Sequence, residues 1–297
     1  MRITLILVLL IIVGCASKRK TECNYITDYY PNTANAEVEF YLGNYQKAYN
    51  YYQKAFENCD AIKIGFLHDT DKFAKICAEL GKDDLAIDYI KKTIDKGGTL
   101  NEFQNDKVFN DIFKTERGKK LIADYDKIRE KYISTLNMNL RAELQAMIEI
   151  DQRLVGQQEK RDSVFKVNDK RLVEIFDEFG YPNEQVVGNY GIDFTSADPT
   201  ILLLHTDDSI RINYFIPKVK EFVKNGKCPP YTLGTMYDNL ELFNKQPQTH
   251  GTFESQNGGY ANMISDLSKV NANRAEIGLP SLKMTKKIDS LRSLRRQ

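Results

Sequence analysis

The sequence lacks tryptophan, has only three histidines and carries almost no net charge. Its 42 Lys and Arg residues balance 41 Asp and Glu residues, so the formal net charge is +1. A protein that binds nucleic acid needs a basic face to meet the phosphate backbone. The even balance of charge therefore argues against this class, and we expect no nucleic-acid partner.

Common motifs of nucleotide-binding and hydrolytic enzymes are also missing. The sequence contains no P-loop, no G-x-G-x-x-G fingerprint and no G-x-S-x-G nucleophile elbow. The spacing of its five cysteines matches no C-x-x-C metal pattern. We therefore predict no cofactor and no bound metal, and the sequence does not decide whether the protein is an enzyme.

Long apolar runs are absent except at the start, where residues 1–15 read MRITLILVLLIIVGC. This run is shorter than the roughly 20 residues that span a bilayer, but it fits the apolar part of a secretory signal. Its end, Ile12 to Cys15, resembles the bacterial lipobox. The alternative is an ordinary signal with a chance cysteine, although the A-x-A type of cleavage site is missing.

The lipobox resemblance implies a lipid-anchored protein of the bacterial cell envelope. It implies that the signal peptide, residues 1–14, is removed and that Cys15 carries the lipid. Residues 15–24 would then form a tether to the membrane, which is the expected partner of the lipid. We expect the outer membrane, on its periplasmic or its surface face.

Four cysteines follow Cys15, namely Cys23, Cys59, Cys77 and Cys228. We expect Cys59 at the end of one helix and Cys77 in the next, so the two sulfurs can lie near each other. A disulfide between them is allowed outside the cytosol. The alternative, which the loose spacing favours, is that the cysteines are small buried apolar side chains.

Two stretches of the first half repeat one pattern. LGNYQKA at 42–48 is followed by YYQKA at 51–55, and LGKDDLA at 80–86 is followed by YIKK at 89–92. This pattern resembles the tetratricopeptide repeat, which implies paired helices in a domain over residues 25–135. The resemblance implies a concave face that binds a peptide or a partner protein, whereas the alternative role is that of a stalk.

Each position in the repeated pattern has a physical reason. Glycine can adopt the left-handed conformation that ends a first helix, and small alanines let paired helices approach closely. We expect first helices near 34–42 and 66–80, with a closing segment over 100–132. The residues expected to pack the repeats are Leu42, Gly43, Ala48, Tyr52, Ala55, Leu80, Gly81, Ala86 and Ile90.

The second half shows helical periodicity and no persistent strand pattern, so we predict an all-α protein. A helix near 209–224 should kink at Pro217, and Thr232 should cap a helix that reaches about residue 244. The second domain is expected over 138–282. The basic tail, 283–297, is expected to be a solvated or frayed helix, or to touch an anionic membrane or a partner.

The second half resembles domain-of-unknown-function family 6624, a family without an assigned activity. The resemblance departs at His250, where we expect tyrosine, and at Asn239, where arginine commonly follows the aspartate. The motifs that carry it are Asp151-Gln152, Gly180-Tyr181-Pro182, His205-Thr206-Asp207, Tyr237-Asp238, the block QTHGT at 248–252 and the block RAEIGLP at 274–280.

A group of polar residues in the second half is the candidate site. A histidine with carboxylates can act as a general base or a weak metal ligand, but a histidine at a helix end can be purely structural. We predict that these residues converge. The site residues are His205, Asp208, Asp238, Gln248, His250 and Thr252. The sequence thus favours a peptide-binding scaffold, with a hydrolase-like enzyme or small-ligand-binding protein as the alternative.

Overall fold

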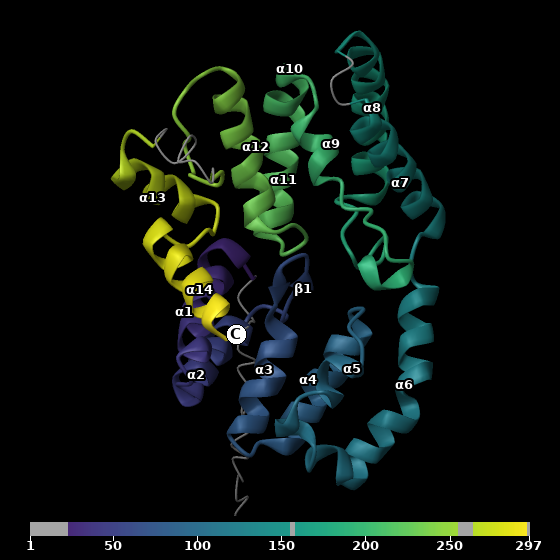
Figure 1. Ribbon diagram of the computed structural model, residues 1–297, viewed down its shortest axis with the longest axis vertical. Helices are drawn as coiled ribbons and strands as arrows, with labels where there is room; N and C mark the ends of the chain where they lie inside the picture. Colours follow the sequence, from purple (N-terminus) through teal and green to yellow (C-terminus); the bar gives the residue numbers. More distant parts are fainter. Residues whose placement is uncertain (1–22, 155–157, 255–263, 296–297) are drawn as a thin grey trace, which may run out of the picture.

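The computed structural model describes residues 23–154, 158–254 and 264–295, which form a mainly helical protein (Figure 1). The sheet within these ranges is one short antiparallel hairpin, so the predicted all-α fold is confirmed. No helix in the described ranges is both long and apolar enough to cross a bilayer. The predicted signal peptide, Cys15 and the Gly258-Gly259 loop lie outside these ranges.

The first half of the chain forms the lower tier in Figure 1. Its elements are η1 (Tyr25–Tyr29), α1 (Tyr30–Tyr41), α2 (Tyr45–Phe56), β1 (Lys63–Ile64), β2 (Leu67–His68), α3 (Asp69–Glu79), α4 (Asp83–Asp95), α5 (Asn101–Gln104), η2 (Lys107–Phe109), η3 (Ile112–Lys114) and α6 (Glu116–Ser134). Helix α1 packs on α2 and α3 packs on α4, and α6 then packs on α4.

The turns inside both helix pairs depend on glycine. Gly43 follows α1 with φ of +78° and Gly81 follows α3 with φ of +66°, a conformation that glycine adopts without strain. Ala48 and Ala86 are fully buried in the second helix of each pair. Leu42 was expected to pack in the first pair, which is wrong, because it ends α1 and is 46% exposed.

The remaining predicted packing positions lie inside or at the edge of the core. Tyr52, Ala55 and Ile90 are fully buried, whereas Leu80 at the end of α3 is only partly buried. Within the predicted closing segment, 100–132, the Thr115 side chain accepts a hydrogen bond from the N–H of Gly118 at 3.0 Å. This cap begins α6, the helix that leads to the second half.

The second half forms the upper tier in Figure 1, except for α14, which lies beside α1. Its elements are α7 (Met138–Arg153), α8 (Gln158–Phe179), η4 (Tyr190–Ile192), α9 (Thr200–Leu204), α10 (Asp208–Ile210), η5 (Arg211–Phe215), α11 (Ile216–Lys224), α12 (Pro230–Phe243), α13 (Leu267–Glu276) and α14 (Leu282–Leu294).

Two details of this half differ from the sequence prediction. Before Pro217 the helix widens into the π-turn η5, in which the N–H of Ile216 donates to the carbonyl of Arg211. A wider turn accommodates a proline, which cannot donate its own helical hydrogen bond. Thr232 does not cap α12, because the helix begins two residues earlier at Pro230, where proline suits the first turn.

The two halves contribute to one shared hydrophobic cluster. Tyr29 and Tyr30 from the first half pack in the same buried cluster as Leu172 and Phe215 from the second. The Tyr30 hydroxyl also donates to the carbonyl of Val223 at 3.2 Å. The expected boundary between domains near residue 136 therefore separates two parts that bury apolar surface against each other.

The C-terminal helix lies against the first helix, and Figure 1 shows α14 beside α1. Arg292 forms an ion pair with Glu37 at 3.1 Å, and Glu37 also binds Lys72 of α3 at 2.8 Å. Ile288 is buried. The prediction of a solvated or frayed tail over 283–297 is therefore wrong for the residues of α14.

The cysteines pair differently from the expectation. A disulfide joins Cys23 to Cys59, so Cys59 is not a partner of Cys77. Cys77 and Cys228 are buried thiols, and burial raises the pKa of Cys77 to about 12. These two cysteines pack as small apolar side chains. The disulfide links the start of the described chain covalently to the segment after α2.

Candidate functional site

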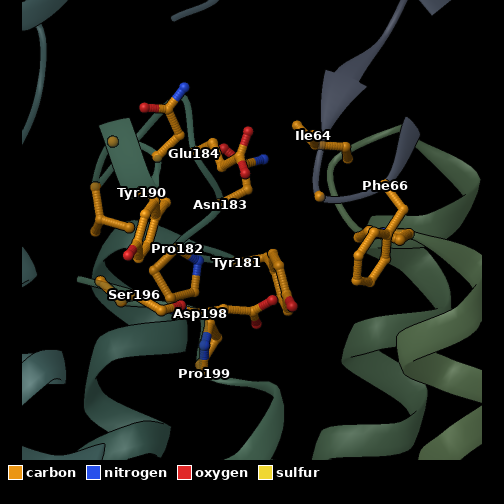
Figure 2. Close-up of a pocket in the computed structure, with 16 residues that line it drawn as sticks. Ile64, Phe66, Tyr181, Pro182, Asn183, Glu184, Tyr190, Ser196, Asp198 and Pro199 are labelled. Atoms are coloured by element: carbon orange, nitrogen blue, oxygen red, sulfur yellow. The ribbon is translucent and has the colours of Figure 1, made fainter. Parts of the chain in front are cut away.

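A cleft of about 320 Å³ opens between the β1–β2 hairpin and the segment from residue 181 to residue 199 (Figure 2). One wall therefore comes from each half of the chain. The cleft is lined by Ile64, Gly65, Phe66, Tyr181, Pro182, Asn183, Glu184, Val187, Gly188, Asn189, Tyr190, Ser196, Ala197, Asp198, Pro199 and Pro229.

The hairpin wall is built around a two-residue turn. Ile64 pairs with Leu67, which leaves Gly65 and Phe66 at the tip. Gly65 has φ of +52°, a value that such a tight turn requires and that glycine adopts readily. The turn places Phe66 at the mouth of the cleft, where its side chain is 82% exposed.

The opposite wall is held by a buried arginine. Arg141 of α7 is 1% exposed and donates to the carbonyls of Val187 and Gly188 at 2.8 and 3.0 Å. It also binds the Asp193 carboxylate at 2.6 Å, and this contact holds the pKa of Asp193 well below its usual range. Five hydrogen-bond donors on one planar group can fix an irregular loop in this way.

The same wall is tied to the first half of the chain. The Tyr132 hydroxyl of α6 donates to the carbonyl of Glu184 at 2.7 Å. The Asn189 side chain donates to the carbonyl of Gly97 at 2.7 Å. Each bond therefore joins this wall of the cleft to an element of the first half.

The surface of the cleft combines aromatic and acidic groups. Tyr190 is 62% exposed, and Figure 2 shows it on the opposite side of the cleft from Phe66. Burial raises the pKa of the Glu184 carboxyl, although the charge of nearby Lys63 opposes this shift. Asp198 is exposed. Apolar walls with a few polar groups suit an extended peptide or a small organic ligand.

Part of the site predicted from sequence forms a separate cluster around Asp238. This carboxylate is fully buried on α12 and accepts hydrogen bonds from the backbone N–H groups of Thr249, His250 and Thr252 at 2.7–2.8 Å. The Thr252 hydroxyl adds a bond of 2.7 Å. Gln248 exchanges hydrogen bonds with the backbone of Phe253. Asp238 therefore shapes the loop after α12.

His250 is enclosed by this cluster. Its ring stacks on Tyr237 with centroids 4.9 Å apart, and its carbonyl accepts a bond of 2.7 Å from buried Arg274. Burial lowers the pKa of His250, against the opposing charge of Asp238. These contacts explain the residue types of the cluster by structure alone, since each polar atom needs a partner once buried.

His205 does not join the Asp238 cluster, which corrects the predicted convergence. Its Nδ1 lies 2.9 Å from both carboxylate oxygens of Asp151, and its ring stacks on Phe165 with centroids 5.1 Å apart. No hydrogen bond joins His205 to Asp238 within the described residues. Asp208 is exposed at the start of α10 and belongs to neither group.

Asp151 was not predicted as the partner of His205, although its position in the sequence carries a signal. Asp151 lies four residues after Met147 and seven after Leu144, which places it on the apolar face of α7. A carboxylate in such a position must find a partner, because an isolated buried charge is costly. Arg141 lies next to Leu140 at the start of the same face of α7. It is likewise a charged side chain on an apolar face, and its partners were not predicted.

The comparisons with known proteins do not supply a function. The chain matches no family model, no curated protein and no solved structure. Within the described part of the chain, no group of three or more His, Cys, Asp or Glu residues is arranged to hold a metal ion. A proposal for function must therefore come from the cleft, the His205–Asp151 pair and the N-terminal sequence.

Proposed function

We propose that this protein is a lipid-anchored component of the bacterial cell envelope that binds an extended peptide segment of a partner protein. The lipobox-like sequence at Cys15 supports the anchor, and the cleft between the two halves supports the binding. The resemblances to tetratricopeptide repeats and to family 6624 remain predictions. Neither resemblance names a partner.

The observation that carries the proposal is the pair of exposed aromatic side chains at the cleft. Phe66 is 82% exposed and Tyr190 is 62% exposed, and both line a cavity whose apolar walls are fixed by hydrogen bonds. Aromatic residues provide a large share of the binding energy in many protein interfaces. Their exposure beside a rigid cleft favours a binding role over a purely structural one.

The cleft is a better candidate than the inner face of the repeats. A repeat scaffold would present α1 and α3 to a peptide, but α14 packs on α1. Arg292 of α14 binds Glu37, which in turn binds Lys72 of α3. The chain therefore covers this face with its own last helix, whereas nothing in the described residues fills the cleft.

The binding proposal can be tested by changing one exposed aromatic residue at a time. Phe66→Asp and Tyr190→Asp should each reduce the protein that copurifies from native membranes by about tenfold or more. Phe243→Asp is the matched control, because Phe243 is 69% exposed but does not line the cleft. If all three variants recover as much partner protein as wild type does, the cleft is excluded as the binding site.

The anchor is tested separately. Wild-type protein should incorporate labelled palmitate, whereas Cys15→Ala should not and should accumulate as unprocessed precursor, because the thiol accepts the first lipid. Cys77→Ala serves as a control, since that thiol is buried in the folded protein. A wild-type protein without label would exclude lipid anchoring.

A second candidate function is general-base catalysis by His205. The Asp151 carboxylate orients Nδ1, and Nε2 has no hydrogen bond within the described residues, so a neutral ring can accept a proton there. The ring of His205 stacks on Phe165 of α8, and Asn168 lies one turn further along that helix. The Nδ2 atom of Asn168 is buried and has no hydrogen-bond partner among the described residues. An activity found with a hydrolase substrate panel should vanish in His205→Gln and persist in His250→Gln.

A further inference from the structure

A second pocket, of about 310 Å³, lies next to the disulfide and adjoins the proposed peptide cleft, with which it shares Ile64, Tyr181 and Asn183. Its walls come from the segment after Cys59, the end of α4, the start of the 181–199 segment and the turn after α11. Tyr25, Phe179, Tyr181 and Phe222 contribute aromatic surface. The pocket therefore joins both halves of the chain from another side.

The charges around this pocket are not balanced. Lys63 binds Asp71 at 2.9 Å and Glu102 at 3.6 Å, so its charge is compensated. Lys96 and Lys227 also line the pocket, and neither ammonium group has an ion pair or a hydrogen bond within the described residues. Asp60 is the acidic residue in the lining, and its carboxylate is exposed.

Lys96 is held in an unfavourable setting for a cation. Burial lowers the pKa of Lys96, and the charge of Lys227 acts in the same direction, while Asp60 opposes them. Lys96 and Lys227 each follow the end of a helix, where a cation is favourable, but that position does not explain why both face one cavity. A bound anion would offset the cost of burying Lys96 beside a second cation.

The neutral hydrogen-bond donors of the pocket are already used. The Tyr25 hydroxyl donates to the carbonyl of Asp60, and the Asn225 amide donates to Glu221. The Gln185 amide donates to the carbonyls of Lys63 and Lys96. Among the lining residues that the structure describes, the two ammonium groups are the cationic donors without a partner, and they favour a ligand with negative charge.

We propose that Lys96 and Lys227 form a binding site for a phosphoryl group, with the aromatic walls contacting an attached organic part. Lysine binds phosphate as a point charge, and two lysines can share its oxygens. The phosphoryl group belongs to a free phosphate ester or to a lipid headgroup. Residues 15 and 23 are eight positions apart, so an anchored Cys15 would hold Cys23 within about 28 Å of the membrane.

The test uses the full chain in neutral detergent, titrated with inorganic phosphate, glycerol 3-phosphate and acetate at constant ionic strength. Calorimetry should show saturable binding of both phosphates, weakened about tenfold in Lys96→Met and Lys227→Met. Lys220→Met on α11 is the control, since Lys220 is exposed and does not line the pocket. Because Lys227 is also exposed, its variant remains informative if Lys96→Met fails to fold.

A second arm identifies the source of the phosphoryl group. The protein is placed in vesicles of phosphatidylglycerol or phosphatidylcholine, and acylation of Lys96 and Lys227 is measured by mass spectrometry. Protection by phosphatidylglycerol alone indicates a lipid headgroup, and protection by added glycerol 3-phosphate in neutral vesicles indicates a free ester. The proposal is overturned if neither protects, if acetate binds as tightly, or if both lysine variants bind as wild type does.

Discussion

His205 lies against Asp151, with the imidazole Nδ1 2.9 Å from each oxygen of a carboxylate that is fully buried. Among the described residues, removing the ring would leave the carboxylate with one side-chain donor, the amide of Gln152 at 2.7 Å. We therefore expect His205→Ala to lower the free energy of unfolding by about 2–3 kcal/mol, measured by urea denaturation. Asp208→Ala, an exposed control, should change it by less than about 0.5 kcal/mol. Similar losses in both variants would contradict this account.

Packing of the first helix pair can be tested at Ala48, which is fully buried on α2. Ala48→Leu should overfill the contact with α1 and cost about 1–3 kcal/mol in unfolding free energy. The matched control is Lys47→Leu, because Lys47 is the preceding residue and is exposed. An unchanged melting temperature in Ala48→Leu would show that the contact tolerates a larger side chain.

The stability of the protein should depend on pH through His250. Its pKa in the folded state is lowered by burial, whereas its unfolded value is about 6.5. The unfolded chain therefore binds more protons below about pH 6.5, so this contribution to stability is complete above that pH and is lost as the pH falls. Comparing the melting temperature of wild type and His250→Gln from pH 5 to 8 should show a steeper acid slope in wild type. Parallel profiles would exclude His250 as the cause.

The disulfide between Cys23 and Cys59 closes a loop with a sequence separation of 36. The variant with both cysteines changed to serine should lose about 2–4 kcal/mol of unfolding free energy, mainly because its unfolded chain is less constrained. Cys228→Ser alone tests whether the loss is specific to the disulfide, since that residue is a buried thiol. Reducing agent should destabilise wild type but leave the double variant unchanged, and the opposite pattern would contradict the pairing.

The sequence predicted the structure correctly where a short local pattern is compatible with a single backbone conformation or packing arrangement. Gly43 and Gly81 mark turns that only a flexible backbone makes easily, and Ala48 and Ala86 mark close helix contacts. These positions were expected from the resemblance to the tetratricopeptide repeat, and residue type and spacing give the physical reason.

Contacts between segments that are distant in the sequence could not be predicted from local patterns. The pairing of Asp151 with His205 joins residues 54 positions apart, and nothing in their local sequence selects that partner. The short hairpin carries too few residues to show an alternating pattern, so the Phe66 wall of the cleft was missed. The cleft itself depends on Arg141, whose loop partners begin 46 residues later.

The ion pair between Glu37 and Arg292 has a consequence for how the chain reaches its final state. The two residues are 255 positions apart, so α1 gains its contact with α14 only after the chain between them has been made. Contacts of such long range slow folding, because a large loop must close before they form. The contact between Glu37 and Arg292 is therefore expected to form late in folding.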